Sequence, residues 1–293
     1  MFVACLLAAC LLAACAAVLR GSGMEIVGVA QMFAPGIAST EFSDARLTIS
    51  PDGRAALWFT RNRTGGAGGY DIWLSRRAAD GTWGAAEPVS FNSPARDFDP
   101  AFSADGQHVY FSSDRAGGLG GDDLWRVRVN GKGFDKPEHL GATVNSALNE
   151  WAPMLSPDGR TLLFSSDGHG GAGRMDLFTS RLTAQGFTAA SPVPGDLNTS
   201  ADELDATYLA DGRDIVFSRA GDLSVDDVKL FHVSPRGGRY ARGTLLPEVV
   251  NTAASNTYAP MLDWSGPNRL LFTTRRPANN PHAADLYVVK YRH

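Results

Sequence analysis

Five polar residues recur along the sequence at one interval, and they could do chemistry if the fold brings them together. The members of this series are Asp44, Asp97, Glu150, Glu203 and Asn256. They lie 53 residues apart, and two positions further on Asp99 and Asp205 add negative charge while Arg46 adds a positive one. Several acids at one place create a negative potential that suits a cation, a basic peptide segment or a sugar. These residues are therefore the predicted binding site.

The same carboxylates allow a second function, glycoside hydrolysis. That reaction needs one carboxylic acid as proton donor and a second carboxylate opposite it. The candidates are Asp44, Asp97 and Glu150. Acids with separate roles need different environments, whereas this series is nearly identical from repeat to repeat. A periodic carboxylate can also be purely structural and accept hydrogen bonds from the backbone of the next repeat.

Other catalytic chemistry finds no support in the sequence. The six histidines are scattered, and there is no GxSxG, HExxH or CxxC motif. The three cysteines, Cys5, Cys10 and Cys15, all precede residue 16. We therefore expect no metal, no cofactor and no cysteine nucleophile in the folded body. The Gly-rich segments 64–69 and 116–121 lie between two predicted strands and do not open a helix, which indicates hairpin loops and not phosphate-binding loops.

Charge and composition narrow the class of protein. There are 27 Lys and Arg against 31 Asp and Glu, so the net charge of -4 offers no clustered basic excess for nucleic acid. The 32 Gly and 16 Pro predict many turns between short strands. A protein of long helices is excluded.

The first 23 residues have the character of an export signal. From Phe2 to Leu19 the chain is continuously apolar or small. The segment Leu12-Ala13-Ala14-Cys15 resembles the bacterial lipobox, which implies lipid modification of Cys15 and a stable membrane anchor. The alternative is an ordinary signal peptide without a lipid. Both predict export to the periplasm or the outer membrane, with membrane contact only through the N-terminal anchor.

An internal repeat predicts the elements that position these residues. Four turns, SPDGR, SADGQ, SPDGR and LADGR, place their aspartates 53 residues apart, at Asp52, Asp105, Asp158 and Asp211. Each unit predicts four short antiparallel strands, for example 98–103, 107–113, 123–129 and 137–141. A single twisted sheet of this size cannot bury both faces until neighbours stack on it. The sequence therefore predicts an all-β, five-bladed β-propeller that fills residues 25–293 as one domain.

The two ends of the chain predict how the ring closes. The last unit ends after its third strand, 284–291, and lacks a fourth. Residues 25–33 precede the first unit, where the missing fourth strand would be expected. We expect them to pair with the C-terminal strand as the outer strand of the fifth blade.

The repeat strings resemble a known family. SPDGR followed by LLFSSD, a Gly-rich loop and Asp-Leu-Phe, at 156–178, is similar to the WD40-like, TolB-type repeat of exported bacterial proteins. The resemblance implies a periplasmic or envelope-associated propeller that serves as a scaffold for protein contacts. It covers residues 25–293, yet five units differ from the six blades and extra N-terminal domain of TolB.

The sequence thus predicts a non-enzymatic binding or scaffold propeller of the cell envelope, whose partner is an envelope protein or a cell-wall polysaccharide. The alternative is a five-bladed glycoside hydrolase of the arabinanase type. One deep pocket with aromatic walls and two unequal carboxylates would favour the enzyme. A shallow, nearly symmetric ring of acids would favour the scaffold.

Overall fold

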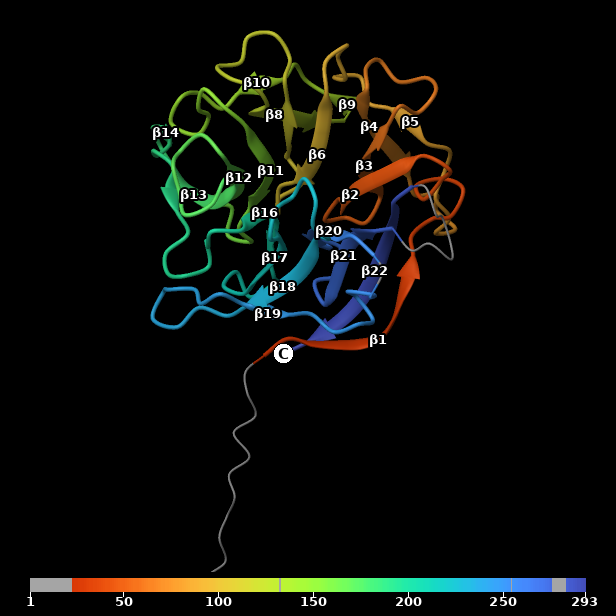
Figure 1. Cartoon of the computed structure of the whole chain (residues 1–293). Helices are drawn as coiled ribbons and strands as arrows, with labels where there is room; N and C mark the ends of the chain where they lie inside the picture. Colours follow the sequence, from red (N-terminus) through yellow and green to blue (C-terminus); the bar gives the residue numbers. More distant parts are fainter. Residues whose placement is uncertain (1–22, 132, 254, 276–282) are drawn as a thin grey trace, which may run out of the picture.

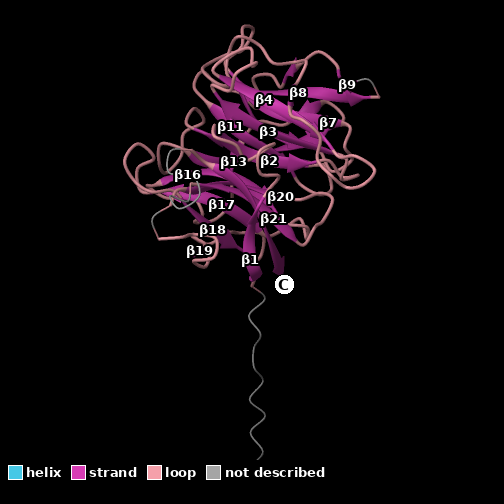
Figure 2. Cartoon of the chain, turned by 90° about the vertical axis from the view of Figure 1, so that its right-hand side faces the viewer, coloured by secondary structure: helices cyan, strands magenta, loops and turns pink. Residues whose placement is uncertain are grey.

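The structure is a computed structural model that describes residues 23–131, 133–253, 255–275 and 283–293. Its regular structure consists of strands arranged as five antiparallel sheets around a common axis (Figure 1). Figure 2 shows the same sheets from the side, with strands and loops but no helix in the described part. None of the described residues therefore forms a helix that could cross a membrane. This architecture confirms the predicted five-bladed propeller.

Each blade is a sheet of four antiparallel strands that runs from the axis outwards. Blade 1 contains β2 (Ser43–Ile49), β3 (Ala55–Arg61), β4 (Tyr70–Arg76) and β5 (Glu87–Pro88). Blade 2 contains β6 (Asp97–Phe102), β7 (His108–Ser113), β8 (Asp123–Asn130) and β10 (Glu138–His139), with β9 (Gly133–Phe134) paired to β8. Blade 3 contains β11 (Glu150–Leu155), β12 (Thr161–Ser166), β13 (Asp176–Thr183) and β15 (Ser191–Pro192), with β14 (Gly186–Phe187) paired to β13. Blade 4 contains β16 (Asp202–Tyr208), β17 (Ile215–Ala220), β18 (Lys229–Val233) and β19 (Thr244–Leu245).

Blade 5 closes the ring with strands from both ends of the chain. It contains β20 (Thr257–Leu262), β21 (Arg269–Thr274), β22 (Asp285–Arg292) and, as its outer strand, β1 (Glu25–Met32). β1 pairs with β22 antiparallel, from Glu25 opposite Arg292 to Met32 opposite Tyr287, as expected from the sequence. The outer edge of β22 is thereby covered, and Ile26, Ala30 and Met32 of β1 pack on the core of blades 4 and 5.

Deletion of residues 25–32 should lower the thermal stability of the propeller and broaden its unfolding transition. The deletion removes the outer strand of blade 5 and exposes the backbone groups of β22 that now pair with it. Calorimetry of the full and the shortened body measures the effect. A shortened protein with an unchanged melting temperature and transition width would contradict the role of β1 in closure.

The periodic turn aspartates belong to the fold. In the first turn, Ser50 Oγ and Arg54 N donate to Asp52 Oδ1 at 2.6 and 3.0 Å. The Ser50 hydroxyl accordingly holds the pKa of Asp52 below its usual value. Gly53 has a φ of 70°, which a side chain rarely tolerates. The same carboxylate contacts recur at Asp105 and Asp158.

The periodic asparagines connect successive blades. Asn145 Oδ1 accepts from Leu124 N at 2.7 Å, and its Nδ2 donates to Leu124 O at 3.1 Å, so the side chain pairs with the third strand of the preceding blade as a peptide group would. The same double contact recurs at Asn92, Asn198 and Asn251. In the first unit Ser39 has this role and bonds to both backbone groups of Leu286. The repeat therefore preserves a connection between blades.

Candidate functional site

A bulge in each innermost strand determines which side chains face the axis. The pairing of the first and second strands shifts register at the same place in every blade. One non-glycine residue there has a positive φ: Arg46, Asp99, Ala152, Asp205 and Ala259, at 56°, 54°, 56°, 45° and 50°. A bulge re-aims a side chain and is common next to functional sites. The ring around the axis thus contains one basic, two acidic and two small residues.

The bulges are supported from the neighbouring blade. Arg46 N donates to Thr273 Oγ1 at 3.0 Å, and Asp205 N donates to Ser165 Oγ at 3.1 Å. Ala259 N instead donates to the carboxylate of Asp205, to Oδ2 at 3.3 Å. The positions of the axial residues therefore follow from contacts between blades and not from mobile loops.

A cavity of about 410 Å³ lies on the axis, at the end where the innermost strands begin. Asp99 and Asp205 line it and are only 5% and 6% exposed. Its walls include five aromatic residues from four blades: Phe59, Tyr70, Phe98, Trp151 and Tyr258. This size and this mixture of apolar walls with a few polar groups are typical of a small-molecule site.

The aromatic wall is held rigidly. Phe59, Tyr70 and Phe98 contact one another, with ring centroids 5.6 to 5.8 Å apart. In the next blade, the indole N–H of Trp151 donates to Asp122 Oδ2 at 2.9 Å, which fixes the orientation of the ring. The cavity is therefore preorganised before any ligand enters.

Arg46 closes the channel below this cavity. Its side chain is fully buried and crosses from blade 1 to blade 3, where Nη2 donates to Ala152 O and Pro153 O at 3.0 and 3.3 Å. Those carbonyls lie one and two residues past the cavity residue Trp151 on the same strand. Arg46 Nη1 is 4.0 Å from Asp205 Oδ1. The site is therefore a closed pocket and not an open tunnel.

Because the two acids of the cavity are buried and repel each other, the pair retains one proton. Burial, and then the charge of Asp205, raise the pKa of Asp99 to about 8. Burial also raises the pKa of Asp205, and the charge of Arg46 opposes the shift of both acids. Because Asp205 is the acid within 4.0 Å of Arg46, we assign the charge to Asp205 and the proton to Asp99. The carboxyl groups are thus unequal.

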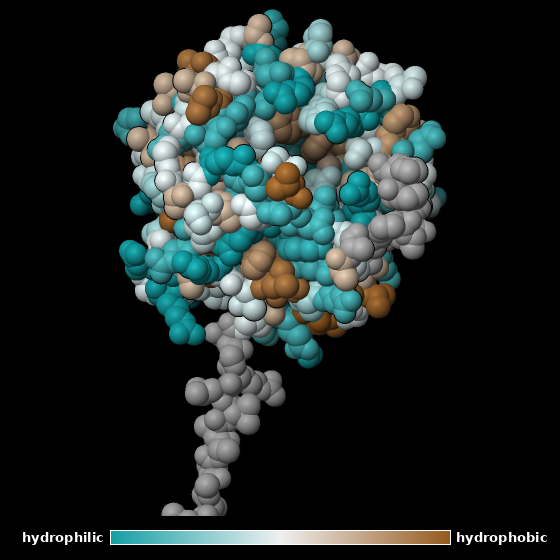
Figure 3. All heavy atoms as spheres, viewed as in Figure 1, coloured by the Kyte–Doolittle hydropathy of each residue, from teal (hydrophilic) through white to brown (hydrophobic). Residues whose placement is uncertain are grey.

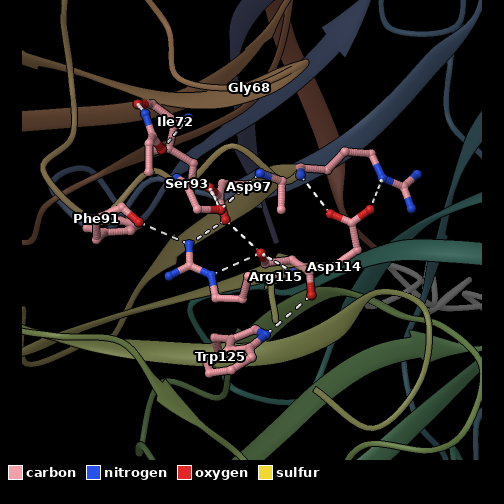
Figure 4. Close-up of polar contacts among 12 residues, drawn as sticks. Gly68, Ile72, Phe91, Ser93, Asp97, Asp114, Arg115 and Trp125 are labelled. Carbon is pink, nitrogen blue, oxygen red and sulfur yellow. Dashed lines mark hydrogen bonds and ion pairs between the residues drawn. The ribbon is translucent and has the colours of Figure 1, made fainter. Parts of the chain in front are cut away.

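The four periodic carboxylates do not line this cavity. The side chains of Asp44, Asp97, Glu150 and Glu203 are all fully buried. Each instead accepts hydrogen bonds from the connection that leads into its blade and from the second strand. Asp97 receives Ser93 N and Ser93 Oγ on Oδ2 at 2.6 and 2.8 Å, and Ser113 Oγ on Oδ1 at 2.7 Å (Figure 4). The sequence predicted that these four side chains gather at the mouth of the channel, and the structure does not place them there.

Two of these four carboxylates form an ion pair with an arginine. Arg115 forms an ion pair with Asp97 and stacks on Trp125, with 5.5 Å from its guanidinium carbon to the ring centroid (Figure 4). Arg219 Nε is 2.6 Å from Glu203 Oε1. Burial raises the pKa of Asp44 and of Glu150, while hydroxyl and backbone donors oppose the shift. These carboxylates are compensated within their own blades and the connections that lead into them, whereas the structural role considered from the sequence placed their partners in the backbone of the next repeat.

The fifth member of the series is displaced by one residue. Thr257, and not Asn256, occupies the first pairing position of β20, opposite Thr274. Asn256 Oδ1 accepts from Val228 N at 2.9 Å, as Asn149 Oδ1 accepts from Asp122 N in blade 3. The last blade therefore has no carboxylate at this position. Asn256 still borders the central cavity.

The aromatic wall is the feature that sequence reasoning missed. Phe98, Trp151, Leu204 and Tyr258 lie between the carboxylate position and the bulge. Their spacing of 53, 53 and 54 residues was the signal that could have revealed them. Of the predicted binding residues, the structure brings together Arg46, Asp99 and Asp205 at the axis. Cys15 lies outside the described residues.

One further group of side chains in the described part has the proximity that a metal ion needs. Ligand atoms of Asp211, Asp214 and His293 lie within 4.8 Å of one another. Asp214 Oδ2 already accepts from Ser234 Oγ at 2.7 Å and lies 2.8 Å from His232 Nε2. These contacts give Asp214 a structural role, so the central cavity is the better candidate site. On the face shown in Figure 3, hydrophobic residues form separate patches among hydrophilic ones.

Comparisons with known proteins concern mainly the fold. No family model matches the chain. A stretch of 67 residues is 36% identical to the uncharacterized protein Atu1656 of Agrobacterium fabrum, covering 23% of this chain and only 20% of that relative. A putative TolB from Agrobacterium tumefaciens has a TM-score of 0.51 at 17% identity, over 80% of this chain and 71% of its own. A thermostable family-43 glycoside hydrolase has a TM-score of 0.58 at 9% identity, over 87% and 90%. The chain therefore shares its propeller fold with TolB proteins and with glycoside hydrolases alike.

Proposed function

We propose that this protein is an exported binding propeller of the bacterial cell envelope that holds its ligand in the central cavity. The cavity itself is the observation that supports this proposal. It combines aromatic walls from four blades with two buried acids and is closed below by Arg46. The periodic ring of carboxylates, the site predicted from the sequence, is occupied by hydrogen bonds within the blades and offers no free surface.

A site-specific photocrosslinker tests the location of the ligand. A benzophenone amino acid at position 223 places the probe at the cavity, which Leu223 lines. The matched control carries the probe at position 29 on β1, the outer strand of blade 5. Val29 is 71% exposed and does not line the cavity. We expect a covalent adduct with an envelope component from position 223 but not from position 29, and its loss in Trp151→Ala. Adducts of equal yield at both positions, or none at 223, would count against the cavity as the binding site.

The proposed location rests on the N-terminal segment. The TolB-type resemblance of the repeats and the apolar run before Arg20 both favour export. We expect Cys15→Ser to release the protein from membranes, because the acylated side chain is lost, and Cys10→Ser to leave it attached. Fractionation of cells that express each variant measures this. Sedimentation of the Cys15→Ser protein with membranes would point to an uncleaved anchor.

Glycoside hydrolysis is the second candidate, and one observation favours it. The cavity has aromatic walls and two acids in unequal environments, with the proton assigned to Asp99 and the charge to Asp205. On this hypothesis Asp99 and Asp205 carry the chemistry, since the carboxylates of Asp44, Asp97 and Glu150 are all buried among structural partners. Chromatography of arabinan and xylan oligosaccharides after incubation tests it. Shortened products that Asp99→Asn no longer forms would establish turnover.

A further inference from the structure

The charges at the floor of the cavity point to an uncharged ligand. Arg46 and Asp205 oppose each other at 4.0 Å, and burial keeps Asp99 in its neutral form below about pH 8. At the rim, Arg96 Nη2 lies 2.9 Å from Asp122 Oδ1 and its Nε 3.1 Å from Asp114 Oδ2. A cation would be repelled by the buried guanidinium, and an anion would meet two carboxyl groups. At the floor, therefore, neither sign of charge is favoured, although the exposed Asp226 adds one more carboxylate to the cavity lining.

The polar atoms at the floor call for a ligand that both donates and accepts hydrogen bonds. Asp205 offers carboxylate oxygens as acceptors, and the protonated Asp99 can donate. Just below them, Arg46 Nε and Nη1 have no hydrogen-bond partner among the described residues. A hydroxyl group can do both, so a ligand with several neighbouring hydroxyls matches this floor. A hydrocarbon ligand would leave these polar groups unsatisfied at a cost.

The aromatic walls of the cavity favour a ligand that also has an apolar face. Phe98 and Trp151 come from adjacent blades and Tyr258 from blade 5, and the indole of Trp151 is fixed by Asp122. Such rings offer flat, apolar, polarisable faces to the C–H groups of a ligand. A ligand with an apolar face and a hydroxylated edge is a sugar ring.

We propose that the central cavity is a subsite for one neutral sugar residue, whose ring lies against the Trp151 side of the wall and whose hydroxyls bind Asp99 and Asp205. This inference rests on the proposed function and names the class of its ligand. A basic peptide segment, the other ligand considered from the sequence, would place a charge beside Arg46. Only an end or a branch of a polysaccharide fits, because the channel is closed below.

Titration of the whole folded body with defined probes tests the inference. The probes are chitotetraose, cellotetraose, xylotetraose and arabinotetraose, with the tetrapeptide Ala-Lys-Ala-Lys as the cationic comparison. We expect saturable calorimetric binding of at least one oligosaccharide at pH 7. Trp151→Ala and Asp205→Asn should each weaken it about tenfold or more, which corresponds to about 1.4 kcal/mol. Trp151→Phe keeps an aromatic face and should retain most of the affinity.

Leu119→Ser is the matched control, because Leu119 is 52% exposed and does not line the cavity. It should bind as the wild type does, and circular dichroism confirms that each variant is folded. If no oligosaccharide binds, or if Trp151→Ala binds as well as the wild type, the sugar subsite is overturned. Binding of the peptide that depends on Trp151 would overturn the sugar while the proposed cavity function stands. If position 223 gives no adduct and no probe binds, both fail.

Discussion

Replacement of Arg46 by methionine should lower the unfolding free energy of the propeller by about 3–5 kcal/mol near pH 8. Arg46 is fully buried, and Asp205 lies within 4.0 Å of its guanidinium. Without it, the carboxylate of Asp205 keeps the cost of its burial but loses the opposing charge. Methionine has an unbranched side chain of similar length, so the loss of charge dominates over the loss of packing. Urea denaturation of both proteins measures the change.

Two comparisons separate this electrostatic effect from simple disruption. Asp205→Asn added to Arg46→Met should recover a large part of the loss, because no unpaired charge is then buried. The loss should also be smaller at pH 5, where a proton can neutralise Asp205. Arg292→Met removes an arginine whose ion pair with Glu25 is exposed, and it should cost less than about 1 kcal/mol. A loss below 1 kcal/mol for Arg46→Met, or no recovery in the double variant, would contradict the assigned pairing.

The fold could be predicted from the sequence because its determinants are local and repeated. The Asp-Gly turns use side chains that bond within a few residues, and the Asn145-type contacts bond to the third strand of the preceding blade. Each repeat therefore contains the residues that fix its own turns and its connection to its neighbour. The closing strand could be predicted by counting, since one blade lacked a fourth strand at one end and residues 25–33 were left over at the other. The observed β1 ends at Met32, one residue earlier.

The candidate site could be predicted only in part, and the bulges are the physical reason. In a regular strand Asp97 and Asp99 would lie on one face, because side chains alternate with a period of two. The register shift between Phe98 and Ala101 breaks that period. Asp99 therefore borders the cavity, whereas Asp97 turns to Ser93 and Ser113. Alternation along the sequence contains no sign of a bulge.

The displacement of the fifth repeat has a similar origin. The positive-φ residue of blade 5 is Ala259, 54 residues after Asp205, so one extra residue precedes it. Counting a constant 53 residues from Glu203 therefore gave Asn256 as the fifth member of the series, whereas Thr257 occupies that position in the structure. The sequence contained the aromatic wall as a periodic pattern. However, a large apolar residue beside a buried strand position is equally consistent with a place in the hydrophobic core. Only the three-dimensional arrangement shows that Trp151 and Tyr258 border a cavity.

Asp99→Asn should flatten the pH dependence of stability between about pH 5 and pH 8. The pKa of Asp99 is about 8 in the folded protein against a reference value of 3.8, so the native state binds a proton that the unfolded chain releases. Its contribution is therefore fully present below about pH 4 and is lost as the pH rises through 8, with a slope of up to about 1.4 kcal/mol per pH unit. Asparagine cannot titrate, so the variant lacks this slope and should be the more stable protein above pH 8.

Urea denaturation of the wild type and the variant at intervals of pH measures the difference between the two curves, in which the other titrating groups cancel. Asp80→Asn is the control. Asp80 is exposed, and the hydroxyl and N–H of Thr82 lower its pKa, so it is ionised in this range and its removal should shift the curve without changing its slope. Parallel curves for Asp99→Asn and the wild type would show that Asp99 is already charged at pH 5. The cavity floor would then carry two negative charges against one positive, and a cationic ligand would replace the neutral sugar as the better match.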